Sequence, residues 1–210
     1  MTLHAAFPRV DLAWTFRRYE ALRARLPQSG FAAVSAHVAD LSAVFGRYDA
    51  FVLDAFGVLN IGETAIAGAV ARIAQMRAAG KRVVVLTNGA SYPREAALAK
   101  YARLGFDFTA DEVVASRDLA AEALAGRGGL WAAITAPGAT FDDLPARVEA
   151  LDADAALLKH ADGFLFLGSE GWTPDRQAAL EAALRARPRP VIVANPDIVA
   201  PREDGLTLEP

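Results

Sequence analysis

The sequence predicts an α/β protein, built on a Rossmann-like parallel sheet and followed by a second α/β segment. Apolar runs of strand length, such as residues 51–53 and 83–86, alternate with stretches that repeat apolar residues at helical spacing. The runs are nearly continuous and rich in valine, as in parallel strands that are covered on both faces. Glycines at 125–129 ("AGRGG") separate a first series of these units from a second.

Composition excludes several classes of function. The 210 residues are 53% hydrophobic with a net charge of -3. The sequence contains no block of basic residues that could bind along a phosphate backbone, so we expect no nucleic-acid partner. The absence of cysteine excludes disulfides and thiolate zinc sites, which leaves oxygen ligands for any metal. Residues 1–30 lack a secretory signal, and no run approaches the roughly 18 apolar residues of a membrane span. We therefore expect a cytoplasmic protein without a membrane partner.

The N-terminal residues 1–46 are predicted to form a helical segment outside the sheet. Between residues 11 and 26, apolar side chains including Leu12, Phe16 and Tyr19 recur at helical intervals, and Pro27 ends the pattern. A second short helix is expected around residues 34–45. Both helices are predicted to serve packing rather than chemistry.

Residues 47–126 are predicted to form the first α/β domain. Buried strands are expected at 50–56 and 82–88, with a helix at 65–80 between them that ends at a glycine, which makes one βαβ unit. The pattern continues with a helix at 93–104, a strand at 112–116 and a helix at 118–124.

Residues 127–200 are predicted to form the second α/β domain, and residues 201–210 to begin a return to the first. Thr173 before Pro174 predicts a helix N-cap followed by proline at the first helical position. Strands are expected at 130–135, 163–168 and 190–195, and helices at 140–151 and 173–186.

Polar residues follow two of the predicted strands in the first domain. Asp54 and Thr87 lie 87 - 54 = 33 residues apart, about the length of one βαβ unit, so both are expected at the carboxyl edge of the sheet, where ligands bind. A buried carboxylate needs a hydrogen-bonding, metal-binding or chemical reason, although an aspartate there also forms turns and helix caps. The small donors after the second strand suit an anion: Thr87, Asn88, Gly89 and Ser91.

These residues resemble a known family. "DAFGVL" at 54–59 and "VVVLTNG" at 83–89 resemble motifs one and two of the haloacid dehalogenase (HAD) superfamily. Together with "LTNGAS", "EVVASRDLA" and "VANPD", they resemble its class IIA branch, which includes 4-nitrophenylphosphatase-like and pyridoxal-phosphatase-like enzymes. The resemblance implies a HAD-like core, here partial, with an α/β cap domain inserted at about residues 127–200.

The resemblance also implies chemistry. Asp54 would attack a small phosphorylated metabolite to form an aspartyl-phosphate, while Thr87 would hydrogen-bond the phosphoryl oxygens. Mg²⁺ would bind between Asp54, the backbone carbonyl of Phe56 and the substrate. The substrate-binding residues would be Asn88, Gly89, Ser91 and Asp197.

Two departures from the family pattern leave other functions open. Phe56 stands where phosphatases place an acid–base aspartate, which favours dehalogenase-like chemistry or a non-catalytic binding or regulatory module as alternatives. The chain ends at "EDGLTLEP" where the cap should return to the core, before motifs three and four. We therefore expect an incomplete core sheet, weak Mg²⁺ binding and little or no activity from this chain alone, and an uncovered sheet edge through which a homodimer could form.

Other residues have simpler interpretations. Ser116 and Arg117 follow the third predicted strand and could line the crevice, but we expect them to cap the helix at 118–124. The "NPD" at 195–197 is either a turn or a group that faces the substrate. The large aromatic residues of the second domain are expected in its core: Trp131, Phe164 and Trp172.

Overall fold

The computed structural model describes residues 10–30, 34–151, 155–202 and 205–208. The chain divides into two compact units. The smaller unit contains residues 29–87 and 94–115, and the larger unit contains residues 1–28, 88–93 and 116–210. Within the described ranges, no helix has both the length and the apolar character needed to cross a membrane.

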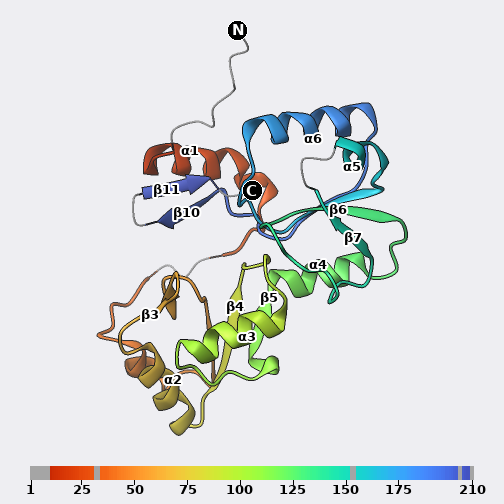
Figure 1. Cartoon of the computed structure of the whole chain (residues 1–210). Helices are drawn as coiled ribbons and strands as arrows, with labels where there is room; N and C mark the ends of the chain where they lie inside the picture. The colour runs from red at the N-terminus through yellow and green to blue at the C-terminus, as the bar shows by residue number, and fades with distance from the viewer. Residues whose placement is uncertain (1–9, 31–33, 152–154, 203–204, 209–210) are drawn as a thin grey trace. The chain divides into compact units, whose positions relative to one another are not determined.

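The smaller unit is built on a three-stranded parallel sheet in the order β1, β4, β5 (Figure 1). These strands are Ala50–Leu53, Arg82–Thr87 and Val113–Ala115. Leu53 pairs with Val85, and Val85 pairs with Val113. The first two predicted strands are therefore adjacent and parallel, which confirms the βαβ unit inferred from their spacing.

Two helices cover one face of this sheet. Side chains from α2 (Ala69–Ala78) and α3 (Arg94–Arg103), among them Met76 and Tyr101, share a buried core with Leu53, Val85 and Val113. The side chains that alternate with these are exposed, with Val52 at 63% and Leu86 at 50%. The strand pattern alone predicted that both faces are covered, which is wrong for β1 and β4, whereas the exposed apolar face agrees with the expected incomplete core sheet. The unit also contains β2 (Asn60–Ile61), β3 (Thr64–Ala65) and short 3-10 helices at Leu41–Val44 and Ala110–Glu112.

The larger unit contains a four-stranded parallel sheet in the order β7, β6, β8, β9. These strands are Arg147–Ala150, Leu130–Ile134, Gly163–Phe166 and Val191–Val193. Its helices are α1 (Leu12–Leu22), α4 (Ser116–Leu124), α5 (Ala155–His160) and α6 (Pro174–Ala186). A hairpin of β10 (Val199–Arg202) and β11 (Gly205–Leu208) follows.

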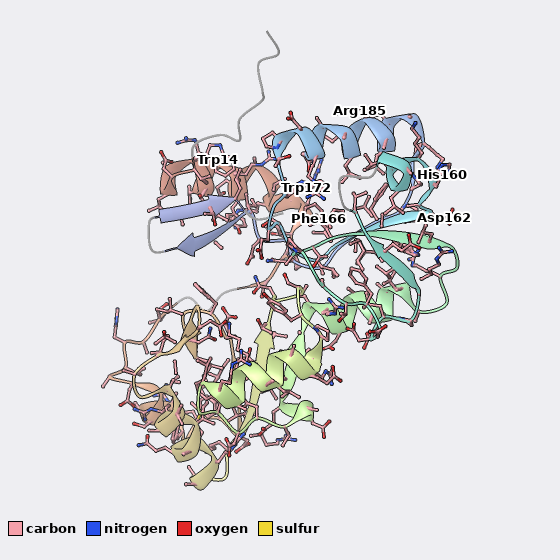
Figure 2. All side chains as sticks on the ribbon, viewed as in Figure 1. Trp14, His160, Asp162, Phe166, Trp172 and Arg185 are labelled. Carbon is pink, nitrogen blue, oxygen red and sulfur yellow. The ribbon has the colours of Figure 1, made fainter. Side chains whose placement is uncertain are left out.

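The central strands of the larger unit are buried on both faces. On one side Trp131 and Leu165 pack with Leu124 of α4, and on the other Phe164 packs with Leu180 of α6. Trp131 and Phe164 are therefore core residues, as predicted. Figure 2 shows Phe166 and Trp172, whose rings meet edge to face at a centroid distance of 5.4 Å. Trp172 is only partly buried at the margin of this core.

Helix α6 confirms the predicted start signal. Thr173 Oγ1 accepts a hydrogen bond from the backbone N–H of Arg176 at 3.3 Å, and Pro174 is the first helical residue. The N–H that proline lacks would have no partner in the first turn, so this sequence begins a helix at little cost.

The predicted helix at 140–151 is wrong. Pro145 lies in its middle, where it would remove a hydrogen bond and clash with the preceding turn. The chain instead turns, with Leu144 N–H bonded to Phe141 C=O, and then forms β7 beside β6. An apolar pattern of helical period was therefore overridden by one proline.

The N-terminal helices also differ from the prediction. In α1, Leu12 and Phe16 of the predicted apolar face are exposed, whereas Tyr19 and Leu22 of the same face are partly buried. Asp11 caps it by accepting a hydrogen bond from Trp14 N–H at 2.6 Å. Within the described part of 34–45, the regular element is the 3-10 helix Leu41–Val44, capped by Asp40.

The two units do not follow the limits predicted at residues 46 and 126. Helices α1 and α4 belong to the larger unit. For α4 the reason is packing, because Ala120 and Leu124 share a core with Trp131. The core and cap limits stay a prediction, and the predicted return segment 201–210 lies partly outside the described residues, at 203–204 and 209–210.

Val85 tests the covered face of the smaller unit. We expect Val85→Ala to lower the free energy of unfolding by about 2 kcal/mol, because Val85 is fully buried between two neighbouring strands. The matched control, Val52→Ala on the exposed face, should change it by less than about 0.5 kcal/mol. Urea unfolding of both variants measures the difference, and equal losses would contradict the one-sided core.

Candidate active site

Asp54 and Thr87 lie at the same edge of the smaller unit's sheet. Thr87 is the last residue of β4, and Asp54 directly follows β1. Because Leu53 pairs with Val85, Asp54 comes level with Leu86, one residue before Thr87. The structure thus brings the two predicted catalytic residues to neighbouring positions at the carboxyl ends of parallel strands.

The chain turns tightly after Asp54. Ala55 C=O accepts hydrogen bonds from Leu59 N–H at 2.8 Å and from Asn60 N–H at 3.1 Å, while Gly57 N–H donates to Asn60 C=O at 2.8 Å. Gly57 has φ +80°, a conformation that favours glycine. This turn ends the strand at Leu53 and leaves Asp54 exposed, which corrects the expectation of a buried carboxylate. Its Oδ1 accepts a hydrogen bond from Ala55 N–H at 2.7 Å.

Oxygen ligands for a metal are few around this turn. Asp54 offers a carboxylate and Phe56 a backbone carbonyl. The carbonyls of Ala55 and Asn60 already accept the hydrogen bonds that close the turn. Both ligands suit Mg²⁺, a hard cation that prefers oxygen, but octahedral coordination needs more of them. Across the described residues, no cluster of three or more His, Cys, Asp or Glu side chains is placed to hold a metal.

The charge of Asp54 affects the pKa of a buried tyrosine, Tyr101. Tyr101 of α3 lies in the core of the smaller unit. Burial raises the pKa of its hydroxyl, and the negative charge of Asp54 raises this pKa further. Tyr101 is therefore held in its neutral form near the proposed nucleophile.

Glu63 does not replace the missing acid–base aspartate. Its carboxylate forms ion pairs with Lys100 at 3.0 Å and with Arg103 at 3.5 Å. The hydrogen bond and charge of Lys100 lower the pKa of Glu63, so it stays ionised at neutral pH.

The predicted substrate-binding residues Asn88 and Asp197 meet in the larger unit. Asn88 Nδ2 donates hydrogen bonds to Asp197 Oδ2 and, at 3.2 Å, to Asn195 Oδ1. Asn195 Oδ1 also accepts from Asp197 N–H at 3.0 Å, so the "NPD" segment forms a turn that contacts Asn88. The interpretation as a turn is therefore confirmed, while contact of this motif with a substrate stays a prediction.

Ser91 belongs to the same segment of the larger unit. Its hydroxyl donates to Leu167 C=O at 3.4 Å. A Cβ at Gly168 would lie only 2.5 Å from Ser91 Oγ, so the close approach requires glycine there. Gly89 lies between Asn88 and Ser91, and residues 88–93 as a whole are assigned to the larger unit.

Arg117 is the residue whose role the sequence did not reveal. It was expected to cap a helix, yet α4 already begins at Ser116, and the Arg117 side chain is only 2% exposed. Its Nε and Nη2 bind Asp143 at 2.6 and 2.7 Å. Asp143 falls in the stretch that was wrongly predicted as a helix, so no signal in the sequence joined the two residues.

Residues 51–140 match the family of haloacid dehalogenase-like hydrolases. A curated relative, the glycerol-3-phosphate phosphatase of Gallus gallus, is 44% identical over 64 residues, which are 30% of this chain and 20% of the relative. A solved haloacid dehalogenase-like hydrolase from Brucella suis is 32% identical, with a TM-score of 0.64 over 80% of this chain and 64% of its own.

A second solved structure contains a metal. It is a glycerol phosphate phosphatase from Mycobacterium tuberculosis in complex with magnesium, 25% identical, with a TM-score of 0.60 over 79% of this chain and 49% of its own. These likenesses confirm the predicted fold class. The chain spans less than two thirds of each of the three relatives.

Gly57 tests the turn after Asp54. We expect Gly57→Ala to cost about 1–2 kcal/mol of unfolding free energy, because an L-residue is strained at φ +80° even where space is open. Gly46→Ala is the control, since Gly46 has an ordinary φ and no atom within 4 Å of a new Cβ. Urea unfolding gives the free energy of unfolding of both variants. No loss in Gly57→Ala would show that residue 57 does not have a positive φ in the folded protein.

Asp143 tests the ion pair through pH. Burial alone would raise the pKa of Asp143, but the hydrogen bond and charge of Arg117 outweigh it and hold the pKa below its ordinary value. Its contribution to stability is therefore present above the unfolded-state pKa of about 3.9 and is lost as the pH falls through the lower folded-state value.

The Asp143→Asn variant lacks this titration. We expect its unfolding free energy to fall less steeply than that of the wild type when the pH is lowered below about 4. The neighbouring, exposed Asp142→Asn should follow the wild type. Urea unfolding between about pH 7 and 2.5 gives the curves, and parallel curves for Asp143→Asn and the wild type would refute the pairing.

Proposed function

Because the chain belongs to the haloacid dehalogenase superfamily, with the features of its class IIA branch, we propose that it is a phosphatase-type hydrolase that uses Asp54 on a small phosphorylated metabolite. The observation that carries the proposal is the placement of Asp54 and Thr87 on adjacent parallel strands, at one sheet edge. An exposed carboxylate and a hydroxyl at such an edge suit a phosphoryl group.

In the proposed reaction, an Asp54 carboxylate oxygen forms a bond to phosphorus as the bond to the leaving oxygen breaks. Thr87 donates a hydrogen bond to the transferring phosphoryl oxygens. The departing oxygen takes its proton from water, because Phe56 carries none. A second water molecule then displaces Asp54 from phosphorus, which releases inorganic phosphate and restores the carboxylate.

Asp54 and the carbonyl of Phe56 would hold Mg²⁺, as part of its oxygen shell. When bound, the ion neutralises negative charge so that a carboxylate can approach an anionic phosphate. The magnesium in the glycerol phosphate phosphatase of M. tuberculosis supports this choice of metal. Asn88, Gly89, Ser91 and Asp197 are proposed to contact the substrate.

Phe56 supports a second candidate. A carbon–halogen bond needs no proton on the leaving halide, so a dehalogenase can work with an aromatic residue at this position, whereas general acid–base help is typically worth about 10²- to 10⁴-fold to a phosphatase. The third candidate function, which Phe56 also favours, is a non-catalytic binding or regulatory module. Partners and location stay predictions: a homodimer in the cytoplasm, without nucleic acid or membrane.

Hydrolysis of a panel of small esters tests the proposal. With Mg²⁺, we expect at most slow release of phosphate from esters such as 4-nitrophenyl phosphate and glycerol 3-phosphate, and a loss of that release of at least about 10³-fold in Asp54→Asn. Asp49→Asn is the control, because the Asp49 side chain is exposed and forms a long ion pair with Lys81 at 3.9 Å.

Each outcome separates the candidates. Equal hydrolysis by Asp54→Asn and the wild type would refute nucleophilic catalysis by Asp54. Halide release from small haloacids without phosphate release would favour dehalogenation. Binding of a phosphate ester without turnover of either kind would favour the binding module.

A further inference from the structure

We propose that Arg117 is a positioning residue, which fixes the backbone of the segment 88–93 that follows Thr87. Its effect on catalysis rests on the proposed function, but its effect on this segment does not. The segment contains three of the four proposed substrate-binding residues, Asn88, Gly89 and Ser91, so the orientation of its backbone bears on the site.

Every N–H of the Arg117 guanidinium has a partner. An arginine has five N–H donors in a fixed plane. Here Nε and Nη2 bind the two oxygens of Asp143, Nη2 also binds Thr140 C=O at 2.6 Å, and Nη1 binds Ala90 C=O at 3.2 Å and Ser91 C=O at 3.4 Å. The side chain therefore joins α4 to residues 140–143 and to the segment.

The contacts of Nη1 set the direction of two successive peptide groups. The C=O and N–H of a trans peptide point in opposite directions, and no described peptide bond is cis. Because Ala90 C=O and Ser91 C=O point to Arg117, the N–H groups of Ser91 and Tyr92 point away from it. These are backbone donors of the kind that an anion uses, and the guanidinium determines their orientation.

Other hydrogen bonds also hold the segment 88–93, but they do not involve the carbonyls that Arg117 binds. Asn88 bonds Asn195 and Asp197, and the Ser91 hydroxyl bonds Leu167 C=O. Those bonds are made by side chains of the segment, whereas Arg117 binds two of its carbonyls. Burying the Arg117 guanidinium without these partners would cost free energy of folding. The same hydrogen bonds therefore hold both the guanidinium and the carbonyls that it binds.

Lysine cannot reproduce the arrangement. It keeps the charge but has a single ammonium group, which cannot bind a carboxylate with one edge and two carbonyls with the other. Arg117→Lys therefore removes the geometry while it leaves a cation beside Asp143. Arg185→Lys is the matched control, because Arg185 lies on α6 of the same unit, exposed and paired only with Glu181 (Figure 2).

Amide hydrogen exchange of the full chain, followed by mass spectrometry, tests the proposal. We expect exchange in peptides that cover 88–93 to be about tenfold faster in Arg117→Lys than in the wild type, with β6 and β8 unchanged. Arg185→Lys should match the wild type throughout. Unchanged exchange at 88–93, or equal acceleration across the whole larger unit, would overturn the positioning role.

Asp143→Asn gives a second measurement if Arg117→Lys does not fold. It keeps the guanidinium but weakens its anchor, so a smaller acceleration confined to 88–93 is expected, and none would overturn the proposal. Should the wild type hydrolyse an ester, kcat of Arg117→Lys should fall about tenfold while Arg185→Lys keeps it. Exchange needs no turnover, so failure of this inference and failure of the proposed function are distinguishable.

Discussion

The parallel pairing of β1 with β4 is the constraint on which the candidate site depends. Parallel neighbours need a crossover, which α2 supplies, and they end at the same edge of the sheet. The register is fixed by burial, because a slip of one residue would turn Val85 out of the core and bring Leu86 into it. Asp54 and Thr87 therefore become neighbours as a consequence of the packing beneath them.

The key charged side chain is exposed in the smaller unit, at Asp54, and buried in the larger unit, at Arg117. In the smaller unit the proposed nucleophile is exposed, and the turn closed by Gly57 keeps the chain from burying it. In the larger unit a guanidinium is buried, and its cost is met by a carboxylate and three carbonyls. An accessible charge suits a group that must react, whereas a satisfied buried charge suits a group that holds others in place.

Phe56 decides how far the likeness to haloacid dehalogenase-like hydrolases can be extended to function. The superfamily, the strand pairing and the placement of Asp54 all agree with phosphoryl transfer, yet the side chain two residues later can neither give nor take a proton. Glu63 is committed to Lys100 and Arg103 and does not fill this role. The reaction that the chain performs therefore depends on whether water can supply the proton, or whether the bond that breaks needs none.

The sequence by itself determined the features that rest on local periodicity: the α/β class, the adjacency of the strands that carry Asp54 and Thr87, and the start of α6 at Thr173 and Pro174. Only the tertiary structure decided the strand β7 after Pro145 and the pairing of Arg117 with Asp143 across 26 residues. Periodicity reports which side chains could be buried, but which of them meet depends on how distant segments pack. An ion pair between distant residues leaves no pattern along the chain, because its partners are neighbours only in the folded protein.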